Sequence, residues 1–403
     1  MTAITFKDEA AASAWDKQAA TAGELSPPLT PSSIHFAADY LGFDPELCSE
    51  LIDGLCLFSQ LPELDSLRGQ FAYFLVIRTL GEMRQPTISM ECHPSARLFF
   101  IYVLLSGLES IRAYHHKLGV DEAITRDTLS DLLLWINQHK EQYSCYGLSQ
   151  FSWLVGHFTG KLYKLGRLQF MFETFHEPFR AYRNTKTRKL IVMCEPGLQF
   201  RADGQFADAD GRLSPVVYLS QLDEDKTEIR GLLVDPRGRV TGEQITLNAE
   251  EWNCVLRKGS PVLGIHIPAV GPMDLAACGK SFAQGMSFFP AIFPNQPFQA
   301  FICGSWLLDP QFAKHLPSTS NITQFLKEFY LHPCPGANGN QTIERVFGFD
   351  IKPDVDINTL PTKTALQRRV IQHLKAGGCW RGGGGILFPE DLNWGSQFYR
   401  EQV

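Results

Sequence analysis

The sequence lacks an excess of basic residues, and this excludes several classes of protein. It carries 37 Lys and Arg against 43 Asp and Glu, a formal net charge of −6. Surfaces that bind nucleic acids or anionic membranes are normally basic. We therefore expect neither a nucleic acid nor a membrane as a partner.

A leader peptide, a long hydrophobic run and a cysteine motif are also missing. The N-terminus shows no basic and apolar leader. The longest apolar run, residues 98–108, is too short to cross a bilayer and is better explained as a buried helix. The ten cysteines are scattered, without a C-x-x-C pair or a zinc-type Cys/His cluster. We expect free thiols in a cytoplasmic protein and no metal site.

The apolar residues that are present suffice for two packed domains. Hydrophobic residues make up 44% of the 403 positions, and a chain of this length usually divides. In the first part, Leu47, Leu51, Leu55 and Phe58 recur at three- and four-residue steps, which is typical of a helix with one buried face. This pattern predicts an all-helical N-terminal domain over residues 1–162.

From residue 163 onward the hydrophobic period changes to two. The segments "RKLIVMCE", "EIRGLLVDPRGRVTGEQITL" and "SPVLGIHIP" are rich in β-branched residues and predict strands. Residues 235–238, "DPRG", have the chemistry of a hairpin turn. Past residue 261 the order becomes strand, helix, strand, helix, with further strands expected at "FQAFICGSW" and at "ERVFGFD" (344–350). The pattern predicts an α+β C-terminal domain, residues 163–403, whose mixed sheet is antiparallel before residue 260 and locally parallel after it, with helices on its faces.

The strand "VLGIHIP" ends in residues that suit a binding site. His266 lies at the end of this strand, where sites often form, and an imidazole titrates near neutral pH as an acid–base catalyst must. A lone histidine on a strand is more often a hydrogen-bonded structural residue than a base, so that role stays open. Ser305 closes the strand "FICGS" and can donate a proton or cap a helix. Cys303 with His266 would suggest a thiol nucleophile, but small packing residues explain Cys303 more simply.

The loop and helix after His266 form a candidate anion site. A helix N-terminus beside a strand end offers N–H groups and a positive dipole, and Lys280 adds charge. Asp274 and Pro272 argue against a phosphate there, and no known phosphate-loop spacing is present. Arg167, inside the apolar run "LGRLQF", needs a carboxylate, carbonyl or phosphate partner. The run "AGGCWRGGGG" either wraps a ligand or is flexible punctuation before a last strand.

Five segments together resemble one bacterial family. The segments "LGRLQF", "GIHIPAVGPM", "FICGSWLLDP", "SNITQF" and "LPTKTALQRRVIQHLKAGG" are similar to a two-domain acyltransferase-like family. Its members join a helical N-acyltransferase N-terminal domain to a C-terminal domain like the GNAT superfamily of N-acyltransferases. The resemblance implies a GNAT-like mixed sheet in which two parallel strands part to admit acyl-coenzyme A.

The resemblance also implies roles for particular residues. The coenzyme would lie along Ile265 and Ile267 and reach the loop at Ala269 and Gly271, near Lys280 and Arg167. The implied catalytic residues are His266 as base and Ser305 as acid, with Trp306 and Asp309 as contacts to the acceptor. The implied reaction moves an acyl group from acetyl-coenzyme A, or a longer acyl-coenzyme A, to a small-molecule or peptide amine without a metal.

Two departures from the superfamily pattern keep an alternative open. The usual Q/R-x-x-G-x-G/A pyrophosphate loop is missing, because "AVGPMDLAAC" offers one glycine and an acid. The tyrosine often found after the second strand is also absent from "SWLLDPQFAKHL". The alternative is a non-catalytic GNAT-like protein that binds a partner.

Overall fold

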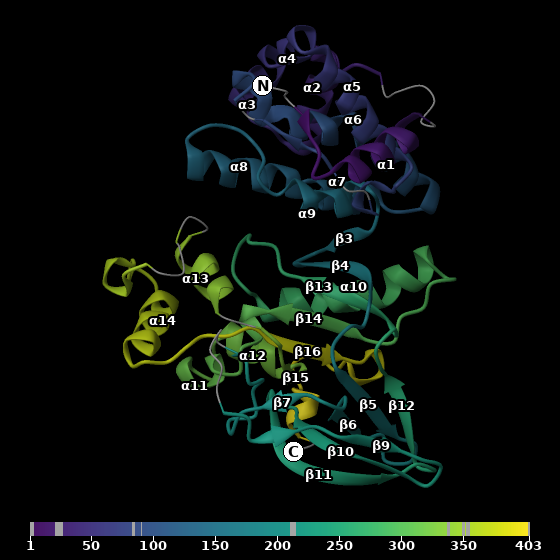
Figure 1. Cartoon of the computed structure of the whole chain (residues 1–403), viewed down its shortest axis with the longest axis vertical. Coiled ribbons are helices and arrows are strands. Elements are labelled where there is room, and N and C mark those ends of the chain that lie inside the picture. Colours follow the sequence, from purple (N-terminus) through teal and green to yellow (C-terminus); the bar gives the residue numbers. More distant parts are fainter. Residues whose placement is uncertain are drawn as a thin grey trace. The chain divides into compact units, whose positions relative to one another are not determined.

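A computed structural model describes residues 4–20, 27–82, 85–89, 91–209, 215–336, 339–348, 351 and 355–401 of the chain. The chain divides into two compact units, Met1–Leu165 and Gly166–Val403. This division lies close to the boundary expected between residues 162 and 163. Figure 1 shows that the first unit is mostly helical, whereas the second contains most of the strands.

The first unit packs its helices around a single apolar core. Helix α6 (Phe99–Leu118) contributes Phe99, Ile101 and Leu104, all fully buried. The other helices are α1 (Glu9–Ala20), α2 (Pro31–Leu41), α3 (Pro45–Asp53), α4 (Cys56–Gln60), α5 (Pro62–Val76), α7 (Glu122–Leu129), α8 (Asp131–Tyr143) and α9 (Phe151–Phe158). The unit also contains the short pair β1 (Ile4–Thr5) and β2 (Thr87–Ile88), and β3 (Leu162–Leu165). The expectation of a helical first unit is confirmed apart from these short strands.

Helix α6 is the longest helix described in this unit. Residues 94–118 are long and apolar enough to cross a membrane by length and composition alone, and 61% of their most apolar stretch is buried within the structure. Its apolar side chains belong to the core cluster of the unit. The interpretation of residues 98–108 as part of a buried helix is therefore confirmed.

The second unit contains two main sheets. The first sheet is antiparallel, with the strand order β11-β10-β6-β5-β12 and with β9 beside β10. Its strands are β5 (Phe179–Asn184), β6 (Leu190–Cys194), β9 (Leu222–Glu224), β10 (Glu228–Asp235), β11 (Arg239–Asn248) and β12 (Trp252–Leu256). The expected hairpin turn joins β10 to β11, where the N–H of Gly238, at φ +86°, donates to the carbonyl of Asp235 over 2.9 Å. Strands β7 (Gln199–Phe200) and β8 (Tyr218–Leu219) form a separate pair.

The second sheet contains the strands expected at "VLGIHIP" and "FQAFICGSW", which pair with each other. Its order includes β15-β16-β14-β13-β4, and only β13 and β14 are parallel. The strands are β4 (Leu168–Thr174), β13 (Pro261–His266), β14 (Phe301–Ser305), β15 (Tyr330–Pro333) and β16 (Gly383–Leu387). The antiparallel and the partly parallel strands therefore form separate sheets and not one continuous mixed sheet.

Helix α10 (Leu275–Ile292) covers one face of the second sheet. Its Phe282 packs edge-to-face against Phe170 of β4 and Phe301 of β14, with ring centroids 5.9 and 5.2 Å apart. The remaining helices are α11 (Phe312–His315), α12 (Asn321–Lys327), α13 (Asn340–Phe347) and α14 (Ala365–Lys375). The strand expected over residues 344–350 was wrong, because residues 340–347 form α13 and residues 349–350 lie outside the described part of the chain.

The last three glycines of the run "AGGCWRGGGG", Gly383, Gly384 and Gly385, belong to the buried strand β16. A Cβ added at Gly384 would lie 2.0 Å from the ring of His332, and one at Gly383 would lie 2.1 Å from the carbonyl oxygen of Leu308. Side chains are excluded because neighbours approach both faces of the strand. For these three glycines, both the interpretation as a flexible connection and the interpretation as a loop that wraps a ligand were wrong.

Candidate active site

Strands β13 and β14 stop pairing with each other toward their C-terminal ends. Their parallel pairing is limited to Leu263 with Phe301 and Gly264 with Ile302. Beyond this point β13 stays paired to β4 as far as His266, and β14 stays paired to β16 as far as Ser305. The two strands therefore open a gap between them while each remains anchored on its outer side.

Backbone polar groups face this gap. The N–H of Leu263 donates to the carbonyl of Ala300 over 3.0 Å. The backbone N–H and C=O groups of the odd-numbered residues of β13 therefore point toward β14, and those of the even-numbered residues of β14 point toward β13. By this alternation, the C=O of Ile265 and both the N–H and the C=O of Gly304 face the gap past the last ladder pair. Gly304 is exposed, and a Cβ there would meet no atom within 4 Å. The gap is therefore open at Gly304.

A histidine and a carboxylate border the gap. His266 Nε2 lies 3.3 Å from Glu173 Oε1, and the two side chains are 33% and 30% exposed. Glu173 belongs to β4 and lies opposite Val262 of β13. Along β13, Gly264 and His266 follow Val262 by two and four residues. All of these residues share one face of the sheet, opposite α10.

Gly264 gives Glu173 the space that this contact needs. A Cβ at Gly264 would lie 2.3 Å from Glu173 Oε1. Glu173 was not predicted from the sequence, although the alternation of Gln169, Met171 and Glu173 in "LQFMFET" marks one face of a strand. What was missing was the register that places this face beside His266.

Ser305 ends β14 and also caps the short helix that follows it. Its hydroxyl accepts a hydrogen bond from the N–H of Leu307 over 3.2 Å, at the start of η4 (Trp306–Leu308). This is the capping role considered for it from the sequence. The hydroxyl keeps its own proton to donate, so the geometry is compatible with both roles.

Cys303 is the candidate that fits its proposed chemistry least. It is 3% exposed, and burial raises the pKa of its thiol to about 12. A nucleophilic cysteine needs a thiolate and access to its substrate. The hypothesis of a thiol nucleophile at Cys303 was therefore wrong, and the simpler interpretation as a packing residue holds.

The loop after His266 is held by an arginine. The guanidinium of Arg167 donates to the carbonyls of Pro268 and Pro272 over 3.1 Å each and to that of Gly271 over 3.4 Å. Of the partners that the sequence allowed for Arg167, the structure shows backbone carbonyls. Ala269 and Gly271 are both exposed on this loop.

The helix that follows the loop begins with an acid. Asp274 is the N-cap of α10, and its carboxylate accepts the N–H of Ala277 over 2.6 Å. This carboxylate already uses the helix N-terminus, as its position in the sequence suggested. Lys280 is exposed on the second turn of α10.

The side chain of Ile265 on β13 is only 3% exposed, so this residue can offer a ligand little more than its backbone. Ile267 is half-buried.

The two residues expected to contact the acceptor lie after β14. The ring of Trp306 is half-buried and packs against Phe312 at a centroid distance of 5.6 Å. Asp309 is fully buried, and its carboxylate accepts hydrogen bonds from the N–H groups of Gln311 and Arg381 over 2.9 and 2.8 Å. Burial raises the pKa of Asp309 to about 6. Asp309 thus has partners within the protein.

One described cluster has the residue types that could hold a metal ion. Potential ligand atoms of Glu177, His332 and Cys334 lie within 4.8 Å of one another. The Nδ1–H of His332 donates to the carbonyl of Pro333 over 2.9 Å, which leaves Nε2 as the acceptor nitrogen. Burial lowers the pKa of His332 and raises that of Cys334. The scattered cysteines did not reveal this cluster, because its members come together only in the fold.

Two domain families match most of the chain. Residues 34–160 match the N-acyltransferase N-terminal domain, and residues 162–387 match the GNAT-like C-terminal domain. No curated protein matches the chain.

Several solved structures are similar over nearly the whole chain. One is an acyltransferase in complex with decanoyl-CoA, at 22% identity and a TM-score of 0.66, covering 95% of this chain and 96% of that chain. Another is an acyltransferase in complex with decanoyl-CoA and teicoplanin, at 22% identity and a TM-score of 0.66, covering 94% and 96%. A third is an acyltransferase mutant in complex with octanoyl-CoA, with the same identity, TM-score and coverage as the second. At this identity, the likeness shows a shared fold.

Proposed function

Because the chain belongs to the family that joins an N-acyltransferase N-terminal domain to a GNAT-like C-terminal domain, we propose that it transfers an acyl group from acyl-coenzyme A to an amine. The observation that carries this proposal is the gap between β13 and β14. A gap lined by backbone N–H and C=O groups suits the amide-containing arm of coenzyme A, which can hydrogen-bond to both.

The reaction is a direct attack of the amine on the thioester carbonyl. A bond forms between the amine nitrogen and the acyl carbon, and the carbon–sulfur bond then breaks. The N–H of Gly304 faces the gap and would stabilise the oxyanion of the intermediate. Its partner donors would come from the backbone near His266 and Ile267.

His266 would remove the proton that the attacking amine loses. With Nε2–H donated to Glu173, Nδ1 is the acceptor nitrogen of the ring. The nearby carboxylate then stabilises the imidazolium that forms. Ser305 would return a proton to the thiolate of coenzyme A.

The acceptor is proposed to be an amine of a small molecule or a peptide. One similar structure contains teicoplanin beside decanoyl-CoA. That acceptor belongs to the other protein, and the present chain shares its fold at 22% identity. A panel of acetyl-, octanoyl- and decanoyl-CoA, each with amine acceptors of both kinds, covers this range.

Thermal melting and transfer assays test the proposal together. An acyl-CoA at 100 times its Kd should add about 2.7 kcal/mol to the free energy of unfolding and raise the melting temperature. His266→Ala should cut kcat about 100-fold or more without weakening coenzyme binding. The control is His176→Ala, an exposed histidine between β4 and β5, which should keep full activity. A melting temperature unmoved by every thioester at millimolar concentration would refute the proposal.

The alternative of a non-catalytic binding protein rests on a specific observation. The carboxylate of Asp274 caps the helix that would otherwise receive the pyrophosphate. The same experiment separates the two functions, because a protein that binds a partner in place of the coenzyme would show neither a thermal shift with acyl-CoA nor acyl transfer to any amine.

A further inference from the structure

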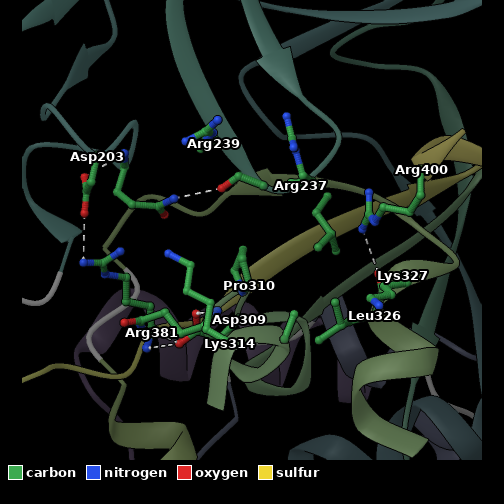
Figure 2. A pocket seen from close by; sticks show the side chains of 15 residues that line it. Asp203, Arg237, Arg239, Asp309, Pro310, Lys314, Leu326, Lys327, Arg381 and Arg400 are labelled. Atoms are coloured by element: carbon green, nitrogen blue, oxygen red, sulfur yellow. Dashed lines mark hydrogen bonds and ion pairs between the residues drawn. The ribbon is translucent and has the colours of Figure 1, made fainter. Parts of the chain in front are cut away.

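The C-terminal unit contains a further pocket. None of its lining residues belongs to β13 or β14, the strands that border the gap. It has a volume of about 470 Å³. Its walls come from the β10–β11 turn, the start of α11, the end of α12, and Arg381 and Arg400 near the C-terminus. Figure 2 shows cationic side chains on several sides of this pocket.

The pocket is basic in a chain that is acidic overall. Six cationic residues line it against two acids, whereas the whole chain has a net charge of −6. The lining cations are Arg237, Arg239, Lys314, Lys327, Arg381 and Arg400, and the acids are Asp203 and Asp309. A concave surface of one sign concentrates the electric field and attracts ions of the opposite sign.

The acids of the pocket are already occupied by other donors. Asp309 accepts hydrogen bonds from Gln311 and from the backbone N–H of Arg381. Asp203 forms ion pairs with Arg381 and Arg201 over 3.1 and 3.0 Å. Arg237 is likewise paired with Asp235, over 2.6 Å. Arg239 also pairs with Asp235, over 3.6 Å, so Lys314, Lys327 and Arg400 are the lining cations for which the described residues show no ion pair.

Arg400 forms no ion pair with any residue that the structure describes. Its guanidinium donates to the backbone carbonyls of Pro236 and Leu326, the latter over 3.3 Å. Burial is the largest influence on this group and lowers its pKa to about 10. A half-buried cation whose hydrogen bonds within the described chain go to backbone carbonyls, and not to a carboxylate, favours the approach of an anion.

Two lysines supply mobile charge beside Arg400. Lys314 of α11 is exposed, and Lys327 at the end of α12 is half-buried. Within the described part of the chain, neither forms an ion pair. Apolar walls at Pro310, Leu326 and Leu331 complete the pocket, which has the size of a small-molecule site.

We propose that this pocket binds a ligand with two or more acidic groups, phosphate or carboxylate, through Arg400, Lys314 and Lys327. Separate cations on several walls suit a ligand with more than one charge. The ligand is either the phosphate portion of coenzyme A or a separate small polyanion. The pocket does not depend on the acyl-transfer reaction for this chemistry.

Calorimetric titration of the full chain with inorganic pyrophosphate tests the proposal. The double variant Lys314→Ala/Lys327→Ala should weaken pyrophosphate binding at least 10-fold. The matched control Lys363→Ala/Lys375→Ala removes the same charge at two exposed positions outside the pocket and should bind like the wild type. Equal binding by both double variants, or no binding by the wild type at millimolar concentration, overturns the proposal; unchanged melting temperatures show that the variants are folded.

Competition between pyrophosphate and coenzyme A then identifies the source of the acidic groups. If saturating coenzyme A blocks pyrophosphate and the pocket variant loses affinity for coenzyme A, the ligand is the phosphate portion of the coenzyme. If pyrophosphate binds with unchanged affinity beside saturating coenzyme A, the ligand is a separate polyanion. A failure of acyl transfer would alter neither result, so the two proposals are tested independently.

Discussion

Among single residues, Gly264 matters for what its missing side chain permits. The carboxylate of Glu173 lies where a Cβ would be and from there reaches His266. The contact between His266 and Glu173 therefore depends on a third residue that itself carries no functional group.

We expect Gly264→Ala to damage catalysis and spare stability. The new methyl group would displace the partly exposed carboxylate of Glu173 into solvent, which a flexible side chain allows at little cost. The kcat should fall about 10- to 100-fold while the KM for acyl-CoA stays the same. Because the effect passes through Glu173, the double variant Gly264→Ala/Glu173→Ala should be no slower than Glu173→Ala. A further loss in the double variant would contradict this mechanism.

Asp309 predicts a pH dependence of stability. Burial raises its pKa in the folded state from 3.8 to about 6, so ionisation is disfavoured in the folded protein. Its contribution to the free energy of unfolding is therefore retained below about pH 4 and lost as pH rises through about 6.

Asp309→Asn removes this titration. Relative to the wild type, the variant should gain up to about 3 kcal/mol between pH 4 and pH 7, from 1.36 kcal/mol per pKa unit. Urea unfolding of the C-terminal unit at several pH values measures the difference. Parallel profiles for the two proteins would show that Asp309 does not titrate in this range.

At the scale of elements, β16 shows what local patterns can miss. Its glycines read as loop residues, yet Gly383, Gly384 and Gly385 are buried in a strand between β14 and β15. The close approach of His332 and Leu308, residues distant in the sequence, makes glycine necessary there.

Two glycines that lie opposite each other in the sheet should differ sharply in how well they tolerate substitution by alanine. Gly304 pairs with Gly384, but a Cβ at Gly384 would strike the buried ring of His332, and one at Gly304 would touch nothing within 4 Å. Gly384→Ala should cost about 2 kcal/mol or more through overpacking, whereas Gly304→Ala should change stability little. Melting temperatures decide the matter, and equal shifts for the two variants would contradict the packing described here.

The elements predicted from the sequence are those with strong local signals. The turn at residues 235–238 and the strand at "VLGIHIP" have Pro, Gly and alternating apolar residues, and both are present. The segment "ERVFGFD" misled because Val346 and Phe347 suggested a strand, whereas Gln341, Glu344 and Arg345 favour a helix. Glu173 was missed because strand register is a long-range property.

At the scale of the whole molecule, the chain has two separate cores. The fully buried residues of the first unit's core cluster span residues 15–158. The second unit has apolar packing of its own, around α10 and its two sheets. Both units were expected from the change in hydrophobic period, which is a property of long stretches and so survives local errors.

Two cores predict two thermal transitions. In the first unit, buried Asp131 accepts hydrogen bonds from the indoles of Trp135 and Trp153 over 3.0 Å each and lies 3.3 Å from His157 Nε2. Asp131→Asn should cost about 3 kcal/mol and lower one calorimetric transition, leaving the other in place. The exposed Asp127→Asn is the control. A single transition that moves as a whole would show that the units unfold together.

The gap between β13 and β14 also bears on aggregation. Unpaired strand groups normally invite pairing with the edge of another protein. Here the opening is closed at one end by the pairs at Leu263 and Gly264, and both flanking strands are fully paired on their outer sides. A strand from another molecule needs a long straight edge to pair with. This short opening can admit a narrow extended ligand but is a poor site for strand-to-strand aggregation of the protein.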